Sequence, residues 1–103
     1  MTYKVQDEVL PHGNVTTVFL DGEIDMDKTE AAKEVIFTHI DAGKEVNLNL
    51  SQVQYMDSSG ISVLIESHQK AIEKGTKMIV KDVSKSVLKV IMMAKLEQIL
   101  NLE

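Results

Sequence analysis

The chain has 103 residues, of which 11 are basic and 16 are acidic, so its formal charge is −5. All basic residues are lysine and cysteine is absent. This composition excludes a disulfide framework and a thiolate metal site, and it argues against direct binding to nucleic acid. No apolar run is long enough for a membrane span or a signal peptide. We therefore expect one cytoplasmic domain with a single core over residues 1–103.

The charges are distributed unevenly along the chain. Residues 1–69 hold 4 lysines and 12 acidic residues, a net charge of −8, whereas residues 70–95 hold 7 lysines and 2 acidic residues, a net charge of +5. Two glutamates in residues 96–103 restore the total of −5. Two interpretations remain open: ordinary solvated surfaces, or a bipolar surface that orients a partner.

The N-terminal part is predicted to form a hairpin followed by a helix. Two β-rich runs, residues 3–10 and 15–20, flank a turn that contains the only proline, Pro11. Asp21-Gly22 is predicted to end the second strand. Asp27 is predicted to cap the first helix, with Glu30 three residues later as in a capping box, and Gly43 to end it.

The rest of the chain alternates between strands and helices. Residues 46–50 are predicted as a strand, followed by a seven-residue connection, 51–57. Ser58 or Ser59 then begins a second helix that ends at Gly75. A strand over residues 77–80, a third helix capped by Ser84 and a short final helical segment over residues 95–102 complete the series. The expected apolar stripe of the second helix is Ile61, Leu64, Ile65, His68 and Ile72. This order predicts an α/β fold, with a mixed, mostly parallel sheet and helices packed against it after the hairpin.

Histidine, acidic and glycine residues are present, but they lack the spacing that metal, nucleotide or acid–base catalytic sites require. His12, His39 and His68 have no metal-ligand spacing, and no glycine-rich nucleotide loop is present. The acidic residues Asp21, Glu23, Asp25 and Asp27 are interpreted as a solvated turn that caps a helix. The six methionines are interpreted as core residues. We expect no enzymatic activity, no metal and no cofactor.

One segment, Met56-Asp57-Ser58-Ser59-Gly60-Ile61, places two hydroxyls at a helix start after a parallel strand. The carboxyl ends of strands are where α/β sheets bind ligands, and a helix N-terminus tolerates a phosphate. Gly60 is expected to leave room for the backbone of another protein. Capping of the helix by Asp57 or Ser58 explains the same residues without any function.

This segment resembles the signature of the STAS-domain family of bacterial anti-sigma factor antagonists. Leu20-Asp21-Gly22-Glu23-Ile24-Asp25 is similar to the family's L-x-G-E-[IL]-D element before its first helix. The resemblance implies a STAS fold and a partner switch in transcription regulation and stress response. The unphosphorylated form binds an anti-sigma factor that is also a serine kinase, and releases the sigma factor. By the same resemblance, phosphorylation of Ser58, with Ser59 as the alternative acceptor, is expected to abolish binding, and a metal-dependent serine phosphatase is expected to restore it.

The resemblance also implies which residues contact the partner. Carried over from the two motifs, they are Asp21, Gly22, Glu23, Asp25, Met56, Asp57, Ser58, Ser59, Gly60 and Ile61. The chain departs from the family pattern at Ser62 and Lys95, where members often have glycine or a small residue, and these positions bear on which partner is recognised. The alternative role is a STAS regulatory subunit of a transporter, of another enzyme or of a secretion pathway.

Overall fold

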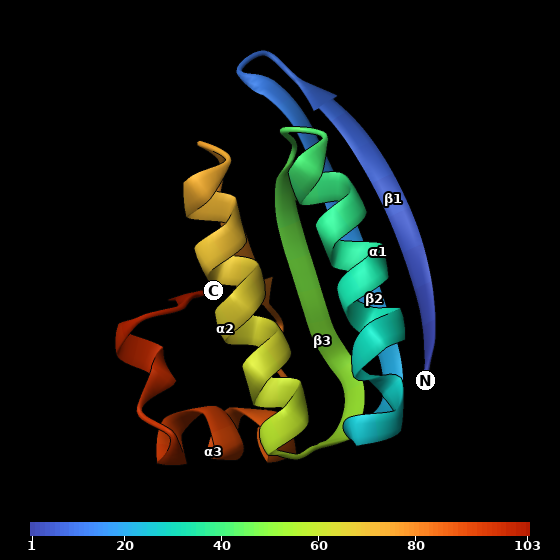
Figure 1. Ribbon diagram of the computed structural model, residues 1–103, viewed down its shortest axis with the longest axis vertical. Coiled ribbons are helices and arrows are strands. Elements are labelled where there is room, and N and C mark those ends of the chain that lie inside the picture. The colour runs from blue at the N-terminus through green and yellow to red at the C-terminus, as the bar shows by residue number, and fades with distance from the viewer.

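Five strands form one mixed sheet in the order β1-β2-β3-β4-β5, and only the β1–β2 pair is antiparallel. The computed structural model describes residues 1–103, and three α-helices connect the parallel strands (Figure 1). The strands are β1 (Thr2–Leu10), β2 (Gly13–Ile24), β3 (Glu45–Met56), β4 (Met78–Lys81) and β5 (Asn101–Leu102), and the helices are α1 (Thr29–Asp41), α2 (Ser58–Glu73) and α3 (Lys85–Met93). The predicted α/β fold with its N-terminal hairpin is confirmed.

The helices share one face of the sheet. Since the strand order follows the chain, every crossover steps in the same direction, and right-handed crossovers of that kind place all their helices on one side. Figure 1 shows α1 and α2 side by side in front of β2 and β3. Val46, Leu48 and Leu50 of β3 are fully buried, whereas Asn47 and Asn49 between them are only partly buried. The core therefore lies between the sheet and its helices.

Two strands are longer than predicted. β2 continues through Asp21-Gly22 to Ile24, with irregular pairing at this point, and Gly22 has a φ of +98°. β3 continues through the predicted connection to Met56. The two extensions pair with each other, Glu23 opposite Tyr55 and Ile24 opposite Met56. This pairing between distant segments makes them strands, although each looks like a loop by itself.

The helix boundaries differ from prediction at two places. Asp25, not Asp27, caps the first helical segment, because its Oδ1 accepts a hydrogen bond of 3.0 Å from the backbone N–H of Asp27. A short 3₁₀ helix, Met26–Lys28, precedes α1. Near the C-terminus, a second short 3₁₀ helix, Leu96–Gln98, leads into β5, which prediction missed because the strand has only two residues. The Ser84 cap of α3 is confirmed.

The buried side of α2 is made partly of small residues. Ile61 and Leu64 are buried as predicted, but Ile72 is 63% exposed, and Ile65 and His68 are only partly buried. The full buried set of the helix is Gly60, Ile61, Val63, Leu64, Ser67 and Ala71. Small side chains allow α2 to pack closely against its neighbours, α1 above all, and Ile72 lies outside the buried stripe. None of the three helices combines the length and apolar character needed to cross a membrane.

Candidate functional site

Asp57 organises the start of α2. Its carboxylate Oδ1 accepts hydrogen bonds from the backbone N–H groups of Ser59, at 2.9 Å, and Gly60, at 3.3 Å. These are two of the helix N–H groups that otherwise lack a partner. Of the two residues considered for the cap, Asp57 is therefore the one that caps, and the hydroxyl of Ser58 is left free of that role.

Ser58 is the first residue of α2, and its side chain is exposed. Its backbone carbonyl accepts a hydrogen bond of 3.1 Å from the hydroxyl of Ser62, one turn later. Ser59 is less exposed than Ser58, because it is partly buried, and its backbone N–H is hydrogen-bonded to the Asp57 carboxylate. Ser58 is thus the more accessible of the two hydroxyls that the sequence singled out.

The end of β2 lies directly beside this helix start. The backbone N–H of Asp57 donates to the carbonyl oxygen of Ile24 at 3.4 Å, so Asp25 follows at the same edge of the sheet. Glu23 pairs with Tyr55 two residues before Asp57. The structure therefore brings Glu23, Asp25 and Asp57 together at the carboxyl ends of β2 and β3.

Asp21 and Gly22 lie further back along β2. They pair with Gln52 and Val53 rather than with the residues next to Ser58. A strand rises about 3.3 Å per residue, so Asp21 lies three residues, or roughly 10 Å, before the end of β2. Asp21 is exposed there, and Gly22 lies against Met1.

Three of the residues expected to contact a partner face the interior. Met56 is 3% exposed, Ile61 is 9% exposed, and Gly60 is also buried. A Cβ on Gly60 would overlap Met56 Cγ and lie 3.2 Å from the carbonyl oxygen of Ile24. The expectation that Gly60 leaves room for another protein is wrong, because that room is filled by the protein's own core. In this structure Met56, Gly60 and Ile61 pack beneath the site, and their contact with a partner stays a prediction.

Exposed apolar side chains next to the site were missed by the sequence reasoning. Met26 is 74% exposed immediately after Asp25, and Tyr55 is 48% exposed two residues before Asp57. The prediction that all methionines are core residues is wrong: Met56 and Met78 are buried, whereas Met26, Met92 and Met93 are exposed. Met92 is 53% and Met93 76% exposed. The signal available for Met26 was its position between two aspartates, which is unusual for a core residue.

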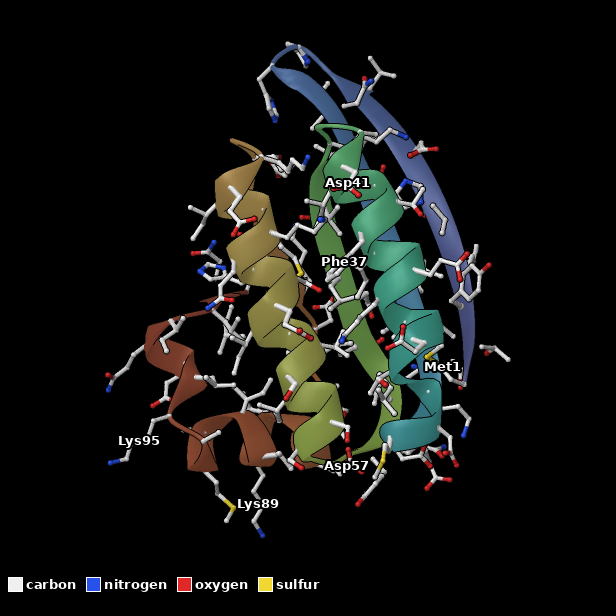
Figure 2. The ribbon with its side chains drawn as sticks, in the orientation of Figure 1. Met1, Phe37, Asp41, Asp57, Lys89 and Lys95 are labelled. Carbon is white, nitrogen blue, oxygen red and sulfur yellow. The ribbon has the colours of Figure 1, made fainter.

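The charge around Ser58 is predominantly negative. Asp57 lies at the N-terminal end of α2 (Figure 2), with Glu23 and Asp25 on the adjacent strand end. The one ion pair formed there joins Lys28 Nζ to Asp25 Oδ1 at 3.5 Å. No group of three or more histidine, aspartate or glutamate side chains is arranged to hold a metal ion. The site offers an exposed hydroxyl in an acidic setting.

The Asp57 cap makes a measurable contribution to folding. Asp57→Ala removes the acceptor for two N–H groups and is expected to lower the free energy of unfolding by about 1 kcal/mol. Asp57→Asn keeps an acceptor oxygen of the same shape and is expected to retain most of that stability. Urea unfolding of both variants checks this. An equal loss in the two would mean that the charge, rather than the hydrogen bonds, is responsible.

Comparison with known proteins agrees with this fold. The model of the STAS domain family matches residues 7–103. Several solved structures are similar in fold, among them the following three. An anti-sigma factor antagonist from Mycobacterium paratuberculosis has a TM-score of 0.81 and 22% identity over 98% of this chain and 85% of that one. Protein TM1081 of Thermotoga maritima has a TM-score of 0.80 and 18% identity over 95% and 84%. The anti-sigma factor antagonist SpoIIAA in its unphosphorylated form has a TM-score of 0.75 and 22% identity over 97% and 88%. On the family match, the chain belongs to the STAS domain family.

Proposed function

We propose that this protein is an anti-sigma factor antagonist that works by partner switching. The unphosphorylated chain binds an anti-sigma factor that is also a serine kinase, and the sigma factor is released. The kinase phosphorylates Ser58, which ends the association, and a metal-dependent serine phosphatase restores the binding form. The chain itself supplies no catalytic group in this scheme.

The observation that carries the proposal is the position of Ser58. Its side chain is exposed on the first residue of α2, while Met56, Gly60 and Ile61 around it are buried. Because Asp57 satisfies the helix N–H groups, the Ser58 hydroxyl is available to a kinase without unwinding the helix. SpoIIAA, which shares this fold, has structures in both an unphosphorylated and a phosphorylated form. A phosphorylatable serine fits this fold.

Ser58→Ala is expected to abolish phosphorylation. The variant is incubated with ATP and the cognate anti-sigma factor kinase, and phosphate is mapped by mass spectrometry. Ser59→Ala is the matched control, since it removes the neighbouring hydroxyl and leaves Ser58 in place. Normal labelling of Ser58→Ala, or loss of labelling only in Ser59→Ala, would move the acceptor away from Ser58.

A second candidate function is that of a STAS regulatory subunit in a larger assembly, such as a transporter, another enzyme or a secretion pathway. One likeness favours it. A chain of the Acinetobacter MlaFEDB complex, in an ATP-bound conformation, has a TM-score of 0.60 and 21% identity over 84% of this chain and 93% of that one. Co-purification with a tagged chain separates the two roles. A small kinase as the stoichiometric partner supports the first, and an assembly with an ATPase or a permease supports the second.

A further inference from the structure

The outward side of α3 carries an open groove that is both apolar and basic. Its apolar part is formed by Leu88, Met92 and Met93, and its basic part by Lys85 and Lys89. The groove has a volume of about 440 Å³. Lys89 points away from the body of the molecule (Figure 2). We call these five residues the α3 patch.

The lysines in and next to the α3 patch are placed against local preferences. Lys85 is the first residue of α3, where the helix dipole disfavours a positive charge. Lys95, two residues after the helix, has a φ of 59°, a left-handed conformation that glycine adopts more easily. Such departures from local preference are expected at functional sites.

These lysines also lack intramolecular partners. Seven of the 11 lysines form an ion pair with a carboxylate, and Lys4 lies over the ring of Phe19. The other three, Lys85, Lys89 and Lys95, form no ion pair. No acidic residue occurs between Asp82 and Glu97. In a chain with a net charge of −5, the α3 segment is therefore a local positive surface available to a partner.

We infer that the α3 patch docks an acidic segment of the protein that covers Ser58, with carboxylates on either side of one apolar side chain. This inference rests on the proposed function, because it assigns a second contact to the same anti-sigma factor. The carboxylates pair with Lys85 and Lys89, and the apolar side chain packs on Met92 and Met93. Methionine side chains are flexible and polarisable, so they suit an exposed docking surface.

The α3 patch and the Ser58 site lie at the same end of the molecule (Figure 1). The Ser86 hydroxyl donates to the carbonyl oxygen of Gln54 at 3.1 Å, and the Ser84 hydroxyl donates to that of Val53 at 2.6 Å. Gln54 precedes Asp57 by three residues, or about 10 Å of strand. Figure 1 shows α3 at the same end of the molecule as the start of α2. A partner surface of about 800 Å², the ordinary size for one side of a specific complex, spans both.

The charges favour a protein segment over a membrane surface. Basic amphipathic helices also bind anionic lipids, but that recognition draws on clusters of about four to eight lysines or arginines. The α3 patch has two lysines, and the whole chain carries a charge of −5. Repulsion of the remaining surface by an anionic bilayer would oppose the contribution of these two lysines.

The test is the double variant Lys85→Glu/Lys89→Glu. Affinity for the cognate anti-sigma factor kinase is measured by surface plasmon resonance with the unphosphorylated chain. We expect a loss of about 10- to 100-fold, because opposite charges across the contact become like charges. The melting temperature should stay close to that of the unaltered chain, since glutamate at position 85 is favoured in the first turn of α3 and Lys89 in the second turn forms no ion pair that the change would break.

The matched control is Lys74→Glu/Lys77→Glu, which makes the same change in net charge at the other end of α2 and before β4. It should bind the kinase like the unaltered chain, and an equal loss in both double variants would overturn the inference. Normal kinase binding by Lys85→Glu/Lys89→Glu would also overturn it. If that normal binding is still lost on phosphorylation, the proposed function stands without the α3 contact. If the unaltered chain does not bind the kinase at all, the proposed function itself fails.

A third measurement addresses the membrane. Sedimentation is performed with vesicles of equal parts phosphatidylglycerol and phosphatidylcholine. The docking inference predicts no lysine-dependent sedimentation. Vesicle binding that Lys85→Glu/Lys89→Glu abolishes would assign the α3 patch to a lipid surface and overturn the inference.

Discussion

Phosphorylation of Ser58 is expected to weaken binding of the anti-sigma factor by about 100-fold or more, equivalent to about 2.7 kcal/mol. A phosphoserine carries about −1.5 to −2 charges at neutral pH and is strongly hydrated. Beneath a partner, that charge loses water while Asp57, Asp25 and Glu23 remain nearby. The helix dipole offsets only about 0.3–1 kcal/mol at an exposed helix start. Repulsion and desolvation therefore exceed the local attraction.

The fold itself is expected to tolerate the phosphate. Ser58 is exposed, and the cap depends on Asp57 Oδ1 rather than on the Ser58 hydroxyl. The buried residues beneath the site, including Met56 and Ile61, do not have to move. Phosphorylation should thus act on association and leave the melting temperature nearly unchanged.

Isothermal titration of phosphorylated and unmodified chain against the kinase, with thermal unfolding of both forms, checks this separation. Ser58→Asp is expected to weaken binding less than phosphate does, because a carboxylate carries less charge. Gln69→Asp is a control on the same helix, since Gln69 is also exposed but lies far along α2 from Ser58. Tight binding by the phosphorylated form would contradict the mechanism. A large fall in its melting temperature would instead mean that phosphate acts by unfolding α2.

The fold is largely predictable because its main signals are periodic. The helices follow from apolar spacings of three and four, and strand–helix alternation then implies a mostly parallel sheet. The ends of β2 and β3 were missed because local patterns record only local preferences. Asp21-Gly22 looks like a turn until its neighbour Glu23 pairs with Tyr55 across the sheet. Such pairing depends on where a second strand lies in the sheet, and the residue pattern of a single segment carries no information about that.

The candidate site is predictable in location but not in the division of roles within it. The sequence correctly places Ser58 at a helix start after a strand. It cannot separate Asp57 as the cap from Ser58, since both residue types are good caps. It also cannot distinguish exposed Met26 from buried Met56, because methionine suits both environments. Burial depends on what packs above each side chain.

Gly60→Ala is expected to destabilise the protein by about 2 kcal/mol, the range for overpacking a filled core. The new methyl group would overlap Met56 Cγ and would lie 3.1 Å from its Sδ. Met56 is 3% exposed, so its side chain has little space to move away. The 3.2 Å approach to the backbone oxygen of Ile24 is even harder to relieve, because Ile24 is held in β2. Urea unfolding measures the loss, and for a domain of this size it corresponds to roughly 8–16 °C in melting temperature.

A double-mutant cycle separates overpacking from other effects of the substitution. In a Met56→Ala background the principal overlap is gone, so adding Gly60→Ala should cost much less than it does in the unaltered chain. An equal cost in both backgrounds would mean that Met56 is not the cause, and that the approach to Ile24 or the helix start dominates. Partner affinity gives an independent readout: Gly60→Ala should weaken binding only as far as it unfolds the chain, because Gly60 is buried and Ser58 remains exposed. A selective loss of affinity in a folded variant would instead return Gly60 to the contact surface.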